Sequence, residues 1–408
     1  MMRVSIDTPD RGNIPVNLYA LNLSTSGSGK GFSMNILEKE VMAGFRRRYL
    51  EDGFPAQAEL AINRLAVARA GRKGTDLDEE LKKVTQEFVN SGELLFSFDS
   101  GTTAAIKQQR HKMLMADAGS LNLQVDEIGS NLEKNEEILT LFLELFDVGA
   151  VKQKLVKNTA ENTRSEEIVG ATPSNMLMFG TPSKLLNGGK VEDMFYSLLE
   201  TGYARRCFFG YSRQTSRSLD YTPEQIYDML TNKASSQFID DMSDKLEILA
   251  DASNMNKKLL IQKPVSLLLI EYKTACERIA YELPEHEDIK KAEISHRYFK
   301  ALKLAGAYAF IDDSPEVLES HVYSAIKLAE ESGEAFHALL TRDRAYVKLA
   351  KYICTCRRSV TQADLVEDLP FYKGSMAQKS EMLQLAIAYG HTNNMVIKKI
   401  FSDGVEFL

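Results

Sequence analysis

The feature that most constrains this chain is a glycine-rich loop ending in a lysine, close to the start of the sequence. Residues 17–23 form a short apolar run, residues 24–31 are STSGSGKG, and helical spacing begins at Phe32. Between a strand and a helix, such a loop surrounds an anion with backbone N–H groups, and its lysine reaches the terminal phosphates. The sequence therefore predicts a nucleotide-binding loop for ATP and Mg²⁺. Its expected contact residues are Ser26, Gly27, Ser28, Gly29, Lys30, Gly31 and Phe32.

Two positions of this loop depart from the usual pattern. Ser24 occupies the position of the first glycine, and Gly31 stands where a serine or threonine normally ligates magnesium. Ser33 or a water molecule could fill that place, because magnesium usually keeps several waters in such sites. A fortuitous Gly/Ser turn is the alternative interpretation.

A pair of acidic residues provides the second part of the predicted site. Asp126 and Glu127 directly follow the apolar segment 121–125. A nucleotide hydrolase needs an acid near its metal and a group that polarises the attacking water. We expect Asp126 to hold magnesium and Glu127 to act on the water. The alternative is an acidic turn at the end of a strand.

Three further residues are candidates for contacts with phosphate. Thr181 ends the buried segment 175–180 and could hydrogen-bond the attacking water or the γ-phosphate, although a simple cap at the strand end is an equal alternative. Arg205 and Arg206 precede another apolar strand and could reach a phosphate, within the chain or across a subunit boundary, as arginine fingers do. The alternative is a surface charge. Arg213 and Arg217 are weaker candidates for the same role.

The predicted elements divide the chain into three ranges. Expected strands are 17–23, 93–98, 122–125, 175–180 and 206–211, each short, mostly apolar and bounded by turn residues. Helical patterns separate them, which predicts an α/β domain at 1–220 with a mostly parallel sheet. Residues 221–342 are expected to be helical, with Thr222 and Ser314 as N-caps, each followed by a proline at the first helical position.

The range 343–408 predicts three helices followed by a hairpin around Asp403-Gly404, which is the order of a winged helix. From Thr341 onward there are ten Lys/Arg and seven Asp/Glu, a charge of +3. This leaves −10 for the rest of a chain whose net charge is −7. The expected third helix carries Lys379 against Glu381, which favours a protein contact. Lys398 and Lys399 in the hairpin are the alternative, a contact with DNA.

Composition excludes several classes of protein. The acidic net charge of −7 provides no general attraction to nucleic acid, so any such contact must be local. The first residues lack a signal-peptide pattern, and the apolar runs are far shorter than the roughly 18 residues that a membrane span needs. The four cysteines fit a reducing cytoplasm, and the six histidines show no zinc-site spacing.

These motifs, in this order, resemble the phage- and plasmid-borne RecA-like P-loop ATPases, a family long described as a domain of unknown function and often joined to primase modules. The resemblance covers residues 12–340. It rests on NLYALNLSTSGSGKG, FSFDSGTTAAIKQQ, LNLQVDEIGS, LELFDVG, MFGTPSKLL, GYARRCFFGY and the helical stretch that begins KALKLAGAYAF. It implies a replicative helicase, with Lys30 as the P-loop lysine, Asp126 and Glu127 as the Walker B pair, and Arg205/Arg206 as the arginines that reach phosphate.

The leading hypothesis is therefore an ATP-dependent DNA helicase of a phage, acting as a homo-oligomer such as a hexameric ring on single-stranded DNA. Its primase would be a separate protein. The first alternative is an origin-binding initiator or helicase loader, in which ATP is a switch and the winged helix grips duplex DNA. A packaging motor is a further alternative, although no nuclease-like acidic cluster follows residue 220. An assembly protein with a degenerate nucleotide site is the last.

Overall fold

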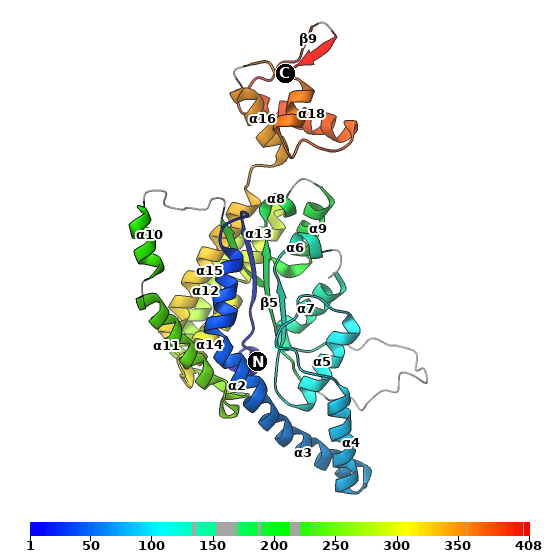
Figure 1. Cartoon of the computed structure of the whole chain (residues 1–408), viewed down its shortest axis with the longest axis vertical. Helices are drawn as coiled ribbons and strands as arrows, with labels where there is room; N and C mark the ends of the chain where they lie inside the picture. Colours follow the sequence, from blue (N-terminus) through cyan, green and yellow to red (C-terminus); the bar gives the residue numbers. More distant parts are fainter. Residues whose placement is uncertain are drawn as a thin grey trace. The chain divides into compact units, whose positions relative to one another are not determined.

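The computed structural model describes residues 1–132, 136–151, 168, 170–186, 189–212, 221–231, 233–356, 358–402 and 404–408. These residues form two compact units (Figure 1). The larger unit comprises Met1–Thr181 and Leu198–Phe336, and the smaller unit comprises Pro182–Ser197 and His337–Leu408. Most of the α/β range and most of the helical range predicted from the sequence thus belong to one unit.

A four-stranded parallel sheet lies at the centre of the larger unit, in the order β4-β5-β3-β6. Tyr19 of β3 lies opposite Met176 of β5 on one side and opposite Cys207 of β6 on the other. This confirms the predicted α/β class with a parallel sheet. The strands are β3 (Tyr19–Ser24), β4 (Leu121–Val125), β5 (Ser174–Gly180) and β6 (Cys207–Ser212).

The two faces of this sheet are covered unequally. In β3, Tyr19 and Leu21 are buried, whereas Ala20 between them is half-buried. The buried face packs on α7 (Glu136–Val148), where the Tyr19 hydroxyl donates a hydrogen bond of 2.6 Å to the Phe142 carbonyl. Successive strand residues point to opposite faces, so the alternation in burial follows directly from the strand geometry.

The strand predicted at 93–98 does not form, apart from a single bridge between Phe98 and Leu123. Side chains take the place of a neighbouring strand in this segment. Gln109 donates to the Glu93 carbonyl at 2.6 Å, and Asn122 donates to the Phe96 carbonyl at 2.6 Å. The backbone groups are satisfied without a ladder, which apolar patterning alone does not reveal.

A continuous run of helices follows the glycine-rich loop, and η1 and η2 within it are π-helical. α3 and α4 lie side by side in Figure 1. The bounds are α1 (Lys30–Ile36), η1 (Leu37–Val41), α2 (Ala43–Arg48), η2 (Tyr49–Gly53), α3 (Phe54–Lys73) and α4 (Leu77–Asn90), then α5 (Thr103–Met115) and α6 (Ile128–Asn131).

A second, smaller sheet was not predicted. Its order is β2-β1-β7-β8, with β1 (Ser5–Thr8), β2 (Gly12–Pro15), β7 (Lys258–Ile261) and β8 (Glu316–Val317). The expected N-cap at Ser314 is wrong, because Ser314 and Pro315 lead into β8 and the Ser314 hydroxyl donates to the Glu316 carbonyl at 2.6 Å. These strands are two to four residues long, too short for a periodic pattern.

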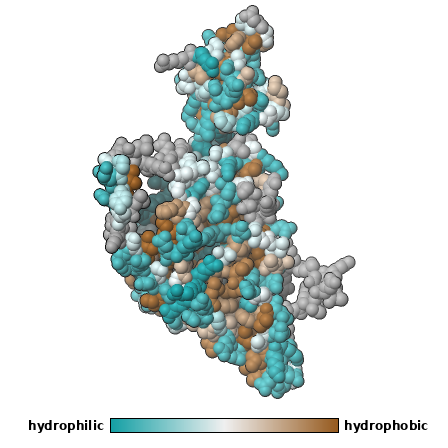
Figure 2. Space-filling model, viewed as in Figure 1, coloured by the Kyte–Doolittle hydropathy of each residue, from teal (hydrophilic) through white to brown (hydrophobic). Residues whose placement is uncertain are grey.

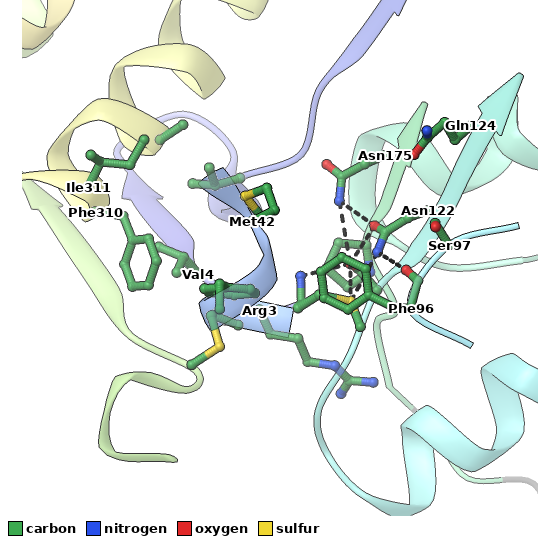
Figure 3. Close-up of a pocket in the computed structure, with 17 residues that line it drawn as sticks. Arg3, Val4, Met42, Phe96, Ser97, Asn122, Gln124, Asn175, Phe310 and Ile311 are labelled. Carbon is green, nitrogen blue, oxygen red and sulfur yellow. Dashed lines mark hydrogen bonds between the residues drawn. The ribbon is translucent and has the colours of Figure 1, made fainter. Parts of the chain in front are cut away.

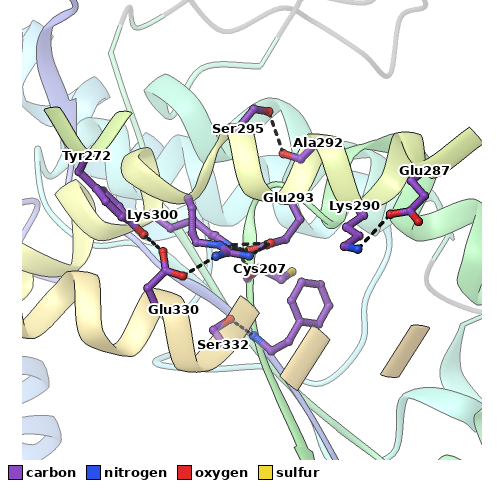
Figure 4. A network of polar contacts seen from close by, with 12 residues as sticks. Cys207, Tyr272, Glu287, Lys290, Ala292, Glu293, Ser295, Lys300, Glu330 and Ser332 are labelled. Carbon is purple, nitrogen blue, oxygen red and sulfur yellow. Dashed lines mark hydrogen bonds and ion pairs between the residues drawn. The ribbon is translucent and has the colours of Figure 1, made fainter. Parts of the chain in front are cut away.

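Two helices of this unit, α14 (Arg297–Ile311) and α15 (Glu319–Leu340), cover the free edge of β6. The amide of Phe209 donates to the Ser332 hydroxyl at 2.7 Å, and Lys300 donates to the Cys207 carbonyl at 2.9 Å (Figure 4). The predicted capping box of Thr222 and Gln225 is confirmed. The elements are η4 (Leu199–Tyr203), α10 (Pro223–Leu230), α11 (Lys233–Leu249), η5 (Ala252–Asn254), α12 (Lys263–Glu282), η6 (Glu285–Glu287), α13 (Asp288–Ser295), α14 (Arg297–Ile311) and α15 (Glu319–Leu340).

The smaller unit contains the three expected helices and the hairpin, around a core that includes Leu349, Leu365 and Leu383. A short segment between two helices joins the hairpin, since Val360 and Leu408 exchange backbone hydrogen bonds of 3.2 and 2.8 Å. Asp403, in the predicted turn, lies outside the described residues. The elements are α8 (Pro182–Leu185), α9 (Lys190–Leu198), α16 (Ala345–Thr355), α17 (Gln362–Asp368), α18 (Met376–Thr392), β9 (Ile400–Ser402) and β10 (Val405–Phe407).

None of the helices in the described part of the chain combines the length and the apolar character that a bilayer crossing requires.

Candidate nucleotide-binding site

The candidate site lies at the carboxyl edge of the central sheet. Because β3, β4 and β5 are parallel, their carboxyl ends meet at the same edge. The glycine-rich loop follows β3, the acidic pair Asp126 and Glu127 follows β4, and Thr181 follows β5. Ligands of open α/β sheets bind at this edge of the sheet.

The backbone of the loop depends on two of its glycines. Gly27 has a φ of 78° and Gly29 a φ of 87°, a region that other residues adopt at a cost. Gly29 is the N-cap of α1, and no side chain caps this helix start among the described residues. The hydroxyls of Ser24 and Ser28 lie 2.7 Å apart and hold the two ends of the loop together.

Lys30 is held against the sheet edge by oxygen atoms from two strands. Its Nζ donates to the carbonyl of Ser24 at 2.8 Å, to the carbonyl of Gly180 at 3.1 Å and to the hydroxyl of Thr181 at 3.2 Å. All of these acceptors are neutral groups. A phosphate oxygen would form a stronger, charge-assisted bond with the same ammonium group.

Glu127 reaches the same point from β4. Its carboxylate accepts a hydrogen bond of 2.9 Å from the Thr181 hydroxyl and one of 3.2 Å from the Thr181 amide. Thr181 therefore connects the loop lysine to the glutamate. Asp126, the preceding residue, is exposed at the end of the strand. The structure thus brings together Lys30, Thr181 and Glu127, three of the residues that the sequence singled out.

A glycine that sequence reasoning missed makes this approach possible. A Cβ atom on Gly180 would lie 2.8 Å from side-chain carbons of both Ile128 and Leu23. The absence of a side chain lets the segment after β4 lie directly against the end of β5. A glycine just before the threonine at a strand end was the available sequence signal.

The residues fit a magnesium–nucleotide complex in part. Asp126 offers an exposed carboxylate, the ligand type that magnesium prefers. Gly31 offers no oxygen, and a Cβ atom there would meet nothing within 4 Å, so the space that a serine or threonine would fill is open. The set of donors is therefore one protein ligand short of the usual arrangement, and water can complete it.

The two predicted arginines do not join this site. Arg206 precedes β6, and β6 runs parallel to β3, so Arg206 lies at the amino edge of the sheet, opposite to the loop. It is only 8% exposed, and it donates to the Asp147 carboxylate at 2.8 Å and to the Gly202 carbonyl at 3.2 Å. The expectation that Arg206, or its neighbour Arg205, reaches the phosphate of its own chain is not met.

Arg213 and Arg217 lie outside the described residues. Their positions therefore add nothing to the geometry of the site.

A separate cavity of about 340 Å³ lies toward the other end of the strands. Phe96, Met42 and Phe310 contribute apolar surface, and Asn122 and Asn175 lie beside them (Figure 3). The two asparagines are already hydrogen-bonded to each other, with Asn175 Nδ2 donating to Asn122 Oδ1 at 2.9 Å. Hydrophobic residues are also conspicuous across the middle of the larger unit in Figure 2. The cavity does not include the loop or the acidic pair.

Comparison with known proteins returned no relative: no family model matches this chain, and no curated protein matches it. The functional interpretation therefore depends on the geometry described above.

Proposed function

We propose that this protein is a RecA-like P-loop ATPase that hydrolyses ATP to move along DNA, as a replicative helicase of a phage does. The observation that carries the proposal is the meeting of Lys30 and Glu127 at Thr181, with hydrogen bonds of 3.2 and 2.9 Å. Two chain segments about a hundred residues apart place a lysine and a carboxylate at one point, beside a glycine-rich loop.

The order of the strands supports the same conclusion. The strand before the loop, β3, lies between β5 and β6, and the strand before the acidic pair, β4, lies beyond β5. The residue at the end of the intervening strand, Thr181, therefore stands between the lysine and the acid. From this position the Thr181 hydroxyl can contact the γ-phosphate while it stays within reach of both Lys30 and Glu127.

The chemistry follows from the contacts. When ATP binds, Lys30 leaves its carbonyl partners and bonds to oxygen atoms of the β- and γ-phosphates, because negative charge is concentrated there. Thr181 is then free to hydrogen-bond the γ-phosphate or the attacking water. Glu127, released from Thr181, orients that water and accepts its proton. Magnesium, held by Asp126 and water, would neutralise charge on the phosphates.

The source of a phosphate-contacting arginine bears on assembly. Arg206 forms an ion pair with Asp147 at the amino edge of the sheet. An arginine finger would therefore come from a neighbouring subunit or from Arg213 or Arg217. We propose a homo-oligomer with ATP at the subunit boundary, in keeping with the family resemblance.

ATP turnover tests the proposal. We expect Lys30→Ala to lower turnover by about 100-fold or more, because it removes a preorganised charge from the transition state. Glu127→Gln should keep ATP binding and lose hydrolysis. Lys39→Ala, on the exposed π-helical turn after α1, is the matched control and should not differ from the unmodified chain. Equal turnover in Lys30→Ala and the unmodified chain would exclude an ATPase at this site.

The alternative is an initiator or helicase loader. The observation that favours it is the range 341–408 of the smaller unit, with helices α16, α17 and α18, a hairpin and a formal charge of +3. Single-stranded DNA that stimulates turnover, together with strand separation, would favour the motor. Tight duplex binding with negligible turnover would favour the initiator.

A further inference from the structure

The hairpin of the smaller unit exposes an aromatic side chain that its fold does not use. Phe401 is 74% exposed and Ile400 is 58% exposed, and neither contributes to the core of this unit. The chain packs the hairpin through its other end, since Leu408 contacts that core. Val405, on the other strand of the hairpin, is also 43% exposed, and exposed apolar side chains that occur as a group mark contact surfaces.

Charge defines the kind of partner. Lys398 and Lys399 directly precede β9, and both are exposed. Lys399 forms an ion pair of 3.0 Å with Glu406, which lies opposite Phe401 in the hairpin. Lys399 thus neutralises the acidic residue beside the aromatic ring, and this ion pair lowers the pKa of Glu406. Lys398 forms no ion pair within the described part of the chain, so it can pair with an anionic partner.

The neighbouring helix α18 does not offer the same combination. Its outward-facing residues include Met376, Ser380 and Gln384, and its Lys379 is followed by Glu381. The outward face of α18 is therefore neutral, whereas the hairpin presents an aromatic ring and a lysine. Of these two surfaces, the hairpin is the one suited to a polymer that carries phosphates and planar rings.

We propose that hairpin β9–β10 binds single-stranded nucleic acid, with the Phe401 ring stacked on a base and Lys398 paired with an adjacent phosphate. The choice of partner rests on the proposed function, while the surface itself does not depend on ATP hydrolysis. Stacking on an aromatic ring tolerates every base, because every base has a π-face. The contact therefore selects for strand type and not for sequence.

The test is fluorescence anisotropy of the full-length chain with labelled dT20, without nucleotide, across a salt series. Phe401→Ala should weaken binding roughly tenfold, the size of one lost stacking contact, whereas Phe401→Tyr should retain it. Lys398→Ala should reduce the slope of log affinity against log salt by about one. Phe238→Ala, at a site on α11 that is 64% exposed, is the matched control and should have no effect.

Several results would overturn the proposal: no binding of dT20 by the unmodified chain, equal affinity of Phe401→Ala, or an equal loss in Phe238→Ala. A loss confined to a duplex of the same length would also overturn it. So would a fall in the oligomeric mass of Phe401→Ala by light scattering, because it would identify the hairpin as a subunit contact. ATP turnover, measured separately on Lys30→Ala, shows whether the nucleotide site fails independently.

Discussion

The two edges of the central sheet use charged residues in opposite ways. At the carboxyl edge, Lys30 is half-buried and Asp126 is exposed. At the amino edge, Lys303 is fully buried and Arg206 is only 8% exposed, with each bound to partners of its own chain. The same residue types are thus accessible to a ligand at one edge and part of the packed interior at the other.

This difference indicates which basic residues are candidates for binding a ligand. A buried charge must be paired and hydrogen-bonded to remain in a protein interior, and these partners leave it no capacity for a ligand. Lys300, Glu293 and Arg297 illustrate this, with hydrogen bonds of 2.8 Å and 2.7 Å to the glutamate (Figure 4). Lys30 differs from these residues, because a phosphate can replace the carbonyl oxygens to which it donates.

The largest expected effect is on stability, and it concerns the ion pairs of Glu293 with Lys300 and Arg297. Glu293→Ala should lower the free energy of unfolding of the larger unit by about 3–5 kcal/mol, because it leaves buried Lys300 without its counter-charge. Urea denaturation measures this. Glu330→Ala is the control: Glu330 also bonds Arg297 but is 46% exposed, so its loss should cost less than about 1 kcal/mol. Equal losses would contradict the contrast between paired buried and exposed charges.

At the carboxyl edge, the comparison predicts lost activity with little lost stability. Thr181→Val removes the hydroxyl between Lys30 and Glu127 while keeping the shape of the side chain. We expect turnover to fall by about 10- to 100-fold, because the lysine and the carboxylate lose their alignment. The Thr201 hydroxyl bonds only locally, to the Leu198 carbonyl at 2.8 Å, so Thr201→Val should leave turnover unchanged. A Thr181 variant with normal turnover would show that the bridge is structural.

Lys303 provides a pH test of burial at the amino edge. Burial, aided by Arg11 and Arg206 and opposed by Asp147, lowers its pKa from 10.5 to about 7. The unfolded chain then binds more protons than the folded chain above about pH 7, so this lysine contributes stability that increases from pH 7 toward 10.

The measurement compares unfolding free energies of the unmodified chain and Lys303→Met at pH 7, 8, 9 and 10. The difference should shift in favour of the unmodified chain by about 1.4 kcal/mol per pH unit at most. A constant difference would show that Lys303 stays charged, held by the carbonyls of Pro15 and Phe146 and by Asn17.

The smallest expected effect is a gain. Gly31→Ser places a hydroxyl at the open position on α1, where a Cβ atom meets nothing within 4 Å. We expect the magnesium concentration for half-maximal turnover to fall by roughly tenfold or less, because one protein ligand is added. Gly71→Ser, at an equally open helical glycine of α3, controls for helix stabilisation. An unchanged magnesium requirement would show that Asp126 and water suffice.

Much of the fold could be predicted because its signals are local. The apolar runs that became β3, β4, β5 and β6 are each bounded by turn residues, and the helix cap at Thr222 follows from side-chain chemistry. The segment 93–98 has the same apolar character and is not a strand. Its backbone partners, Gln109 and Asn122, come from elements distant in the sequence, so the pattern alone could not exclude it.

The sequence by itself determined the loop, because Gly27 and Gly29 supply positive φ angles that few other residues tolerate and Lys30 follows them directly. Only the tertiary structure decided which charges are available to a ligand. Arg206 and Lys30 both lie beside apolar strands in the sequence, yet Arg206 is buried and bound to Asp147 at the amino edge, whereas Lys30 lies at the open carboxyl edge. Burial and pairing arise from packing between distant segments, which a local pattern cannot encode.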